Sequence, residues 1–174
     1  MISIIVGTNR QDSISKQIAN QYKRLLAERN EESAIIDLRE LPDDFIFSAL
    51  YHNTGKNAAF NKILDQLNQS EKFVFIVPEY NGSFPGVLKA FIDGMTYPSS
   101  FLNKKCALVG LSSGVQGAGL ALSHLTDIFN YLGMHVLALK PKLARIEKNM
   151  EEGKIKDPLY LELLEDQVRQ LISF

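Results

Sequence analysis

Five short apolar runs divide the chain at regular intervals, and they constrain its fold more than any other feature. The runs are rich in β-branched residues and do not alternate with polar residues, which is typical of strands buried on both faces of a sheet. Segments of helical periodicity separate them. We therefore expect five parallel strands, at Ile2 to Val6, Ser33 to Leu38, Lys72 to Val77, Cys106 to Leu111 and His135 to Leu139.

Each connection between these runs contains apolar residues at helical spacing. In the first connection, Ile18, Tyr22 and Leu25 fall on one face of the predicted helix. Similar faces precede the third run and follow the third and fourth runs, and a last helix is expected over about Asp157 to Ile172. The stretch Pro42 to Gly55 is interpreted as an irregular excursion ahead of the helix that precedes the third run.

Strict alternation of strands and helices predicts one α/β domain over residues 1–174, a three-layer doubly wound sandwich around a five-stranded parallel sheet. The flavodoxin-like strand order 2-1-3-4-5 is the commonest arrangement of this size, and we infer it by analogy. The charged stretch Lys140 to Lys156 is interpreted as a solvated connection to the last helix, with a lid or interface segment as the alternative.

Composition narrows the classes of function. The 19 Lys and Arg residues are matched by 20 Asp and Glu residues, whereas nucleic-acid-binding proteins usually carry a basic excess. No apolar stretch approaches the ~20 residues that cross a bilayer, so we expect neither a nucleic-acid partner nor a membrane segment. The single cysteine, Cys106, favours a reducing, cytoplasmic compartment. His52, His124 and His135 are scattered along the chain, so we expect no metal site.

Polar and glycine-rich motifs concentrate in three loops that follow predicted strands. In an open α/β sheet, ligands bind at the carboxyl ends of the strands where the strand order reverses, here between the first and third strands. The first loop, Gly7 to Ser15, ends at a helix N-terminus, whose unpaired N–H groups attract anions. Thr8, Ser13 and Ser15 add hydroxyl groups and Arg10 adds a fixed charge, which favours a terminal phosphate. Alternatively, Ser13 only caps the helix and Arg10 is solvated.

The second loop, Val77 to Lys89, contains two prolines and two glycines. Such a loop fixes backbone N–H and C=O groups in space, as is common where a flat polar heterocycle binds. The alternative is that Ser83 and Pro85 only start the next helix, which leaves Pro78 to Asn81 unexplained. The third loop, Leu111 to Gly119, carries glycines that either admit a ligand or let a helix pack closely. Neither a Rossmann nor a Walker sequence is present.

These three loops together resemble the NADPH-dependent FMN reductase family, which includes azoreductases, quinone reductases and chromate reductases. The resemblance runs over nearly the whole chain. Its most specific element is the string Pro78-Glu79-Tyr80-Asn81-Gly82-Ser83, followed by Pro85-Gly86, Leu88-Lys89 and Asp93. The chain departs from the family pattern at Ala90-Phe91, where Asn-Ala is frequent, and at Gly94, where an aromatic residue is common. Both departures concern the substrate funnel or dimer surface more than flavin binding.

The resemblance implies a site for FMN. The residues implied to hold its phosphate are Thr8, Arg10, Ser13 and Ser15, with Lys16 and Gln17 close by. Lys89 is interpreted either as a surface residue or as a residue at the rim that guides phosphate groups. The residues implied to lie along the isoalloxazine are Pro78, Glu79, Tyr80, Asn81 and Gly82. The residues implied to close its pyrimidine side are Ser113, Gly114 and Gly117.

The resemblance also implies an activity. NADPH or NADH would reduce the flavin at N5, and a flavin, quinone, azo compound or similar small acceptor would then reoxidise it in the same place, a ping-pong scheme in which no side chain needs to be catalytic. Relatives of this kind are usually homodimers or homotetramers. The alternatives are a flavodoxin-like electron carrier and a relative that has lost flavin. Electron carriers of this kind are typically strongly acidic, and their first loop is rich in Thr and Ser without Arg. The near-neutral net charge and Arg10 therefore both count against the first alternative.

Overall fold

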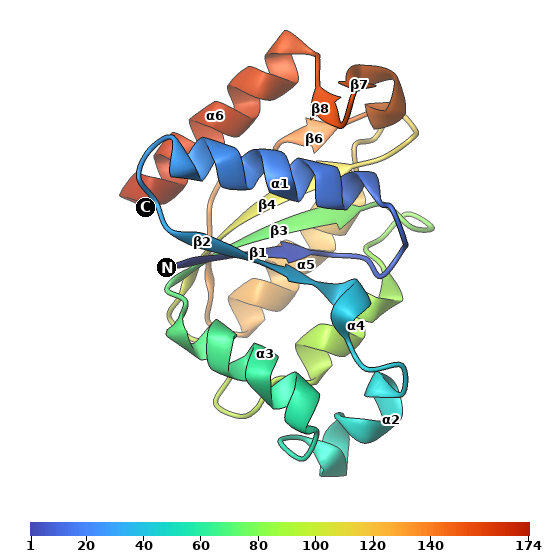
Figure 1. The fold of residues 1–174 in the computed structure, drawn as a ribbon, viewed down its shortest axis with the longest axis vertical. Coiled ribbons are helices and arrows are strands. Elements are labelled where there is room, and N and C mark those ends of the chain that lie inside the picture. Colours follow the sequence, from blue (N-terminus) through green and yellow to red (C-terminus); the bar gives the residue numbers. More distant parts are fainter.

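A parallel sheet forms the centre of the molecule, in a computed structural model that describes all residues 1–174. The predicted strand order is confirmed, because the strands lie in the order β2-β1-β3-β4-β5 and all their pairings are parallel (Figure 1). The strands are β1 (Ile2–Val6), β2 (Ser33–Asp37), β3 (Lys72–Pro78), β4 (Lys105–Leu111) and β5 (His135–Val136).

Helices cover both faces of this sheet, which confirms the three-layer sandwich. One face packs against α1 (Ile14–Ala27) and α6 (Pro158–Ser173). The other packs against α3 (Ala58–Gln69), α4 (Gly86–Asp93) and α5 (Gly119–Tyr131). Figure 1 shows α1 and α6 together on one side and the other three helices opposite. The side chains of β1 are fully buried along its whole length, as expected of a central parallel strand.

Aromatic rings fill the core between the sheet and the face covered by α5. Phe75 of β3 stacks on Phe129 of α5 with ring centroids 4.5 Å apart, and Phe101 meets Phe73 edge to face at 5.3 Å. All four side chains are fully buried. Contacts of this geometry contribute about 0.5–1.5 kcal/mol beyond the burial of their area.

The fifth strand is shorter than the five residues predicted, and a side chain fills the gap in its pairing. β5 ends at Val136, and regular pairing with β4 resumes only at β6 (Lys142–Leu143). Between them the buried amide of Gln167, from α6, donates to the carbonyl oxygens of Leu108 (2.9 Å) and Leu139 (2.8 Å). Gln167 thus satisfies backbone carbonyls where the strand ladder is broken, since unpaired buried groups of this kind are costly.

The expectation of a solvated connection over Lys140 to Lys156 is wrong for much of that stretch. It contains β6, a 3-10 turn (Ile146–Asn149), and the antiparallel pair β7 (Met150–Glu151) and β8 (Lys154–Ile155). Its apolar residues Leu143, Ile146 and Ile155 are buried in the core beneath α1 and α6. The few apolar residues of this stretch lie among many charges and show neither a helical nor a strand period, so the sequence does not predict their burial.

The excursion after β2 contains a short helix, α2 (Phe45–Ser48). It brings Phe45 against Phe60 of α3, with ring centroids 4.7 Å apart. A Cβ atom on Gly94 would lie 2.9 Å from the Phe60 ring and 3.1 Å from the Phe45 ring. The rings of Phe45 and Phe60 therefore fill the space beside Gly94, the position at which the FMN reductase family often has an aromatic residue.

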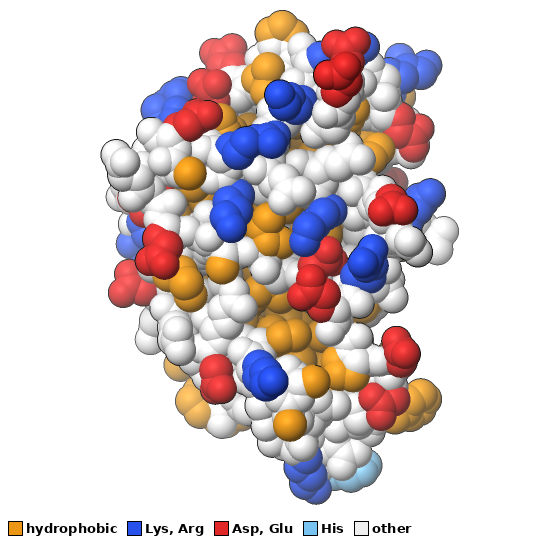
Figure 2. All heavy atoms as spheres, in the orientation of Figure 1, with side chains coloured by type: hydrophobic (Ala, Val, Ile, Leu, Met, Phe, Trp, Pro, Cys, Tyr) orange, Lys and Arg blue, Asp and Glu red, His pale blue; other side chains and the backbone are white.

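The surface mixes charges of both signs. On the face drawn in Figure 2, acidic and basic side chains are interspersed, and hydrophobic atoms form a strip across its centre.

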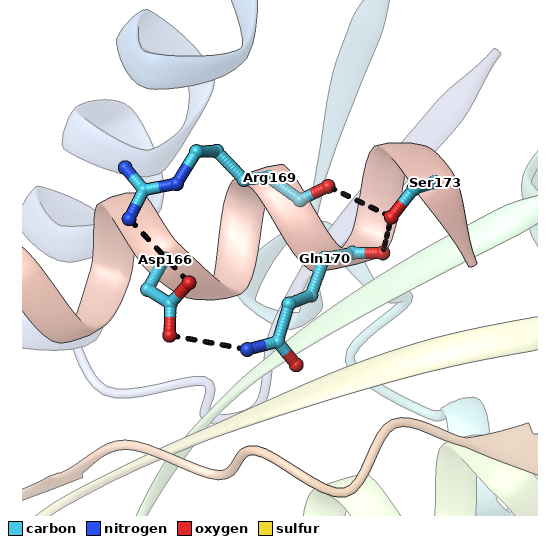
Figure 3. Close-up of polar contacts among 4 residues, drawn as sticks. All are labelled: Asp166, Arg169, Gln170 and Ser173. Atoms are coloured by element: carbon cyan, nitrogen blue, oxygen red, sulfur yellow. Dashed lines mark hydrogen bonds and ion pairs between the residues drawn. The ribbon is translucent and has the colours of Figure 1, made fainter.

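On α6, Asp166 accepts hydrogen bonds from Arg169 (3.4 Å) and Gln170 (3.1 Å), and the Ser173 hydroxyl donates to backbone carbonyls one turn back (Figure 3). No helix is both long and apolar enough to span a bilayer.

Candidate active site

A cavity of about 450 Å³ opens at the carboxyl ends of β1, β3 and β4. This is the point where the strand order reverses, which is where open α/β sheets bind their ligands. All three loops selected from the sequence contribute to its walls. The lining residues are Thr8, Arg10, Gln11, Asp12, Ser13, Ile14, Ser15, Pro78, Glu79, Tyr80, Leu111, Ser112, Ser113, Ile146 and Glu147.

The first turn of α1 faces the cavity with unused hydrogen-bond donors. The Ser13 hydroxyl accepts a hydrogen bond from the N–H of Lys16 at 3.2 Å, so Ser13 caps α1, as one of the two interpretations of this residue predicts. The N–H groups of Ile14 and Ser15 have no acceptor within the protein. The Ser15 side chain is only 1% exposed and its hydroxyl has no partner either. These donors, together with the helix dipole, suit a phosphate group.

Thr8 and Tyr80 join the first and second loops across the cavity. The Thr8 hydroxyl lies 3.0 Å from the Tyr80 hydroxyl, and it also accepts from the backbone N–H of Arg10 at 3.2 Å. The Arg10 side chain is exposed and makes no ion pair or hydrogen bond within the protein. The guanidinium is therefore available to a ligand at the first turn of α1.

The tip of the second loop turns away from the cavity. Tyr80 and Ser83 exchange both backbone hydrogen bonds, at 2.8 and 3.0 Å. Asn81 and Gly82 between them have positive φ angles of 51° and 72°, the conformation of a two-residue hairpin turn that favours Asn-Gly. Pro78, before this turn, lines the cavity together with Tyr80, whereas Asn81 and Gly82 do not.

Glu79 ties the second loop to the third. One of its carboxylate oxygens accepts from the N–H of Ala118 at 3.1 Å, just before α5 begins. Its backbone N–H donates to the carbonyl of Leu111 at 3.0 Å. Glu79 therefore has a structural partner as well as a place in the cavity wall.

The third loop contributes Ser113 to the cavity but not Gly114 or Gly117. A Cβ atom on Gly117 would lie 2.7 Å from the backbone of Lys142, so close packing accounts for glycine there. Gly114 has open space around it, and its carbonyl accepts from the N–H of Arg145 at 2.8 Å.

Three predicted basic or polar residues lie outside the cavity. Lys16 forms an ion pair with Asp37 at 3.0 Å, and Lys89 pairs with Asp93 one turn along α4 at 2.6 Å. Gln17 lies next to Gly153, beside the β7–β8 hairpin, since a Cβ atom on that glycine would be 3.8 Å from the Gln17 amide oxygen. Arg10 is thus the one cation that lines the cavity.

Sequence reasoning missed two groups of lining residues. The first group lies between or beside the predicted residues of the same loops, so including the neighbours of each predicted residue identifies it. It consists of Gln11, Asp12, Ile14, Leu111 and Ser112. Ile146 and Glu147 come from the stretch interpreted as a solvated connection, and the sequence offers no motif there. Their contribution depends on the unforeseen pairing of β6 with β4.

Fold and cavity together define an α/β protein of the flavodoxin-like class, with a cavity at the N-terminus of α1. Comparison with known proteins agrees. Residues 1–141 match the NADPH-dependent FMN reductase family. A 2-hydroxy-1,4-benzoquinone reductase from Burkholderia sp is 32% identical over 145 residues, which cover 82% of this chain and 76% of that protein. This chain belongs to the NADPH-dependent FMN reductase family, so it is an oxidoreductase, and FMN is the cofactor.

Solved structures share the fold. The flavoenzyme FerB, an NAD(P)H:(acceptor) oxidoreductase from Paracoccus denitrificans, has a TM-score of 0.82 at 24% identity, and the match covers 99% of this chain and 94% of FerB. An FMN-dependent NADH-azoreductase from Bacillus anthracis, determined with FMN, has a TM-score of 0.61 at 16% identity over 98% of this chain and 97% of that one.

Gly110, inside β4, provides a test of the packing that shapes the third loop. A Cβ atom there would lie 2.4 Å from the carbonyl oxygen of Gly117 and 2.9 Å from Leu122, and overpacking of this kind costs about 1–3 kcal/mol. We expect Gly110→Ala to lower the free energy of unfolding by at least that amount, as measured by urea denaturation. The matched change Gly114→Ala meets open space and should leave stability within about 0.5 kcal/mol. Equal losses in the two variants would contradict this account.

Proposed function

We propose that the cavity at the N-terminus of α1 binds FMN through its phosphate group. The observation that carries this proposal is the set of donors without partners there, namely the N–H groups of Ile14 and Ser15, the Ser15 hydroxyl and the Arg10 guanidinium. A charged group on the ligand would make charge-assisted hydrogen bonds with them, which are the strong kind. Thr8 adds a hydroxyl at the same end, and Ser13 shares its hydroxyl with the helix cap.

The isoalloxazine of FMN would extend from there along the second loop toward the third. Pro78, Glu79 and Tyr80 supply that wall, and Ser113 supplies the far side. Asn81 and Gly82 would act by shaping the turn that holds Tyr80 in place. The backbone N–H groups of Ser113 and Gly114 have no acceptor within the protein, so they suit the carbonyl and ring nitrogen acceptors of the pyrimidine side.

Bound FMN supplies the redox chemistry, since it accepts two electrons and a proton from NADPH or NADH and delivers them to an oxidant. The protein binds and orients the reactants. Tyr80 is held by its hydrogen bond to Thr8, which fixes the ring beside the cavity. Reductant and acceptor would use the same face of the flavin in turn, a ping-pong scheme.

The acceptor class we favour is a quinone or another flat aromatic oxidant, such as an azo compound or a free flavin. Support comes from the names of the relatives, a benzoquinone reductase at 32% identity and an azoreductase with the same fold. Initial rates at several fixed concentrations of reductant and quinone should give parallel lines in double-reciprocal plots. Intersecting lines would contradict the shared site.

Binding of FMN is tested by titrating the protein with FMN and following the flavin fluorescence. We expect saturable binding of one FMN per chain. A flavodoxin-like electron carrier would bind FMN without oxidising NADPH or NADH. The match to a family of reductases does not favour this alternative function. Failure to bind FMN at all would contradict the proposed site.

The chain is also proposed to form a homodimer or homotetramer. An apolar groove of about 540 Å³ runs between the end of α4 and α5, lined by Ile92, Met95, Ile128 and Leu132 among others. Tyr131, which also lines the groove, is 90% exposed, and large apolar surfaces of this kind often mark protein contacts. Light scattering should give a molar mass of two or four chains. The mass of a single chain would contradict the proposal.

A further inference from the structure

The part of the chain beyond the family match, from residue 142 onward, forms one wall of the cavity. β6 pairs with the end of β4, and the N–H of Ile146 then donates to the carbonyl of Ser112 at 3.1 Å. The N–H of Arg145 donates to Gly114 in the same way. The segment therefore follows the third loop closely and places Ile146 and Glu147 in the cavity wall.

This wall is fixed from behind. Leu143 is fully buried and Ile146 is 2% exposed, and both pack into the core beneath α1 and α6. The hydroxyl of Tyr160, from α6, donates to the carbonyl of Ala144 at 3.0 Å. The backbone that leads to Glu147 is thus held in place where the 3-10 turn begins.

Glu147 is aimed at the third loop and makes the cavity acidic. The Ser113 hydroxyl donates to a carboxylate oxygen of Glu147 at 3.0 Å. Asp12 and Glu79 are the other two carboxylates in the lining, against the single guanidinium of Arg10. None of these four side chains takes part in an ion pair. Three negative charges therefore face one positive charge around a ligand in this cavity.

We infer that Glu147 makes the cavity bind oxidised FMN more tightly than two-electron-reduced FMN, and so lowers the reduction potential of the bound flavin. The inference rests on the proposed function, in which the pyrimidine side of the flavin lies near Ser113. Reduction leaves negative charge on that side of the ring, and a fixed carboxylate next to Ser113 repels it. A lower potential makes bound reduced FMN a stronger reductant toward the acceptor.

Glu147→Gln tests this inference, because glutamine keeps the shape and can still accept from the Ser113 hydroxyl. The dissociation constants of oxidised and reduced FMN would be measured anaerobically at mildly alkaline pH. We expect the constant for oxidised FMN to change less than about twofold and that for reduced FMN to fall about tenfold. For a two-electron couple this ratio equals a rise of about 30 mV in potential. The difference should shrink at high salt, because Glu147 is exposed and exposed charges are screened.

Glu151→Gln is the matched control, since Glu151 is an exposed carboxylate of the same segment that does not line the cavity. It should leave the ratio of the two constants unchanged. An unchanged ratio in Glu147→Gln, an equal change in Glu151→Gln, or equal weakening of both redox forms in Glu147→Gln would overturn the inference. Absence of oxidised FMN binding in the parent protein would instead overturn the proposed function, and this inference with it.

Discussion

Arg10→Ala is expected to weaken FMN binding by about 10- to 100-fold. The Arg10 side chain is the one cation lining the cavity and makes no contact that folding depends on, so its loss should act on the ligand alone. Hydrogen bonds to charged groups contribute about 1.5–3 kcal/mol, and each 1.4 kcal/mol is a factor of ten in affinity. The measurement is the dissociation constant for FMN from fluorescence titration.

Two controls make this result specific for the phosphate. Riboflavin lacks the phosphate, so its affinity should be the same in Arg10→Ala and in the parent protein. Arg24→Ala removes an arginine from the opposite end of the same helix and should leave FMN affinity unchanged. If Arg10→Ala weakened riboflavin as much as FMN, Arg10 would not be a phosphate contact.

Phe75→Ala should cost about 3–5 kcal/mol of unfolding free energy, the range for deleting a buried phenylalanine. Phe75 is fully buried and lies 4.5 Å from the Phe129 ring and 5.9 Å from the Phe101 ring. Its removal leaves a cavity between the sheet and α5. Because native domains are stable by only about 5–15 kcal/mol, the urea midpoint should fall steeply.

Phe47→Ala is the matched control for this loss. Phe47 lies on the excursion after β2 and is 82% exposed. Because substitutions of exposed residues rarely remove packing contacts, the unfolding free energy should change by no more than about 0.5 kcal/mol. Similar urea midpoints for the two variants would show that the aromatic cluster around Phe75 does not stabilise the sandwich as described.

The sequence was most informative where burial is complete. The strands β1, β3 and β4 are buried over nearly their whole length and begin and end within one residue of their predicted limits, because a strand buried on both faces is a nearly continuous apolar run. The edge strand β2 also ends within one residue of its predicted limit, although only Ile36 in it is buried. Strand order came from analogy and was correct. The edge strand β5 is shorter than predicted, and the carbonyls left at its break are satisfied by Gln167, a residue distant in the sequence.

The candidate site was predictable in position but not in full. The ends of β1, β3 and β4 meet because the strands are parallel, so their loops had to be neighbours. The orientation of single side chains within a loop is a tertiary property. Lys16 directly follows the lining residue Ser15, yet its side chain pairs with Asp37 of β2. Glu147 reaches the cavity only because β6 joins the sheet.

In the proposed mechanism, bound FMN takes electrons from a nicotinamide and keeps them until an acceptor arrives. The most direct test is to add NADPH, and separately NADH, to the FMN-loaded protein without oxygen and to follow the visible flavin absorbance. We predict that at least one nicotinamide bleaches the flavin, that the bleaching persists after the nicotinamide is removed, and that a quinone restores the colour. No bleaching with either nicotinamide, or no recovery with the quinone, would rule out the proposed electron transfer through FMN.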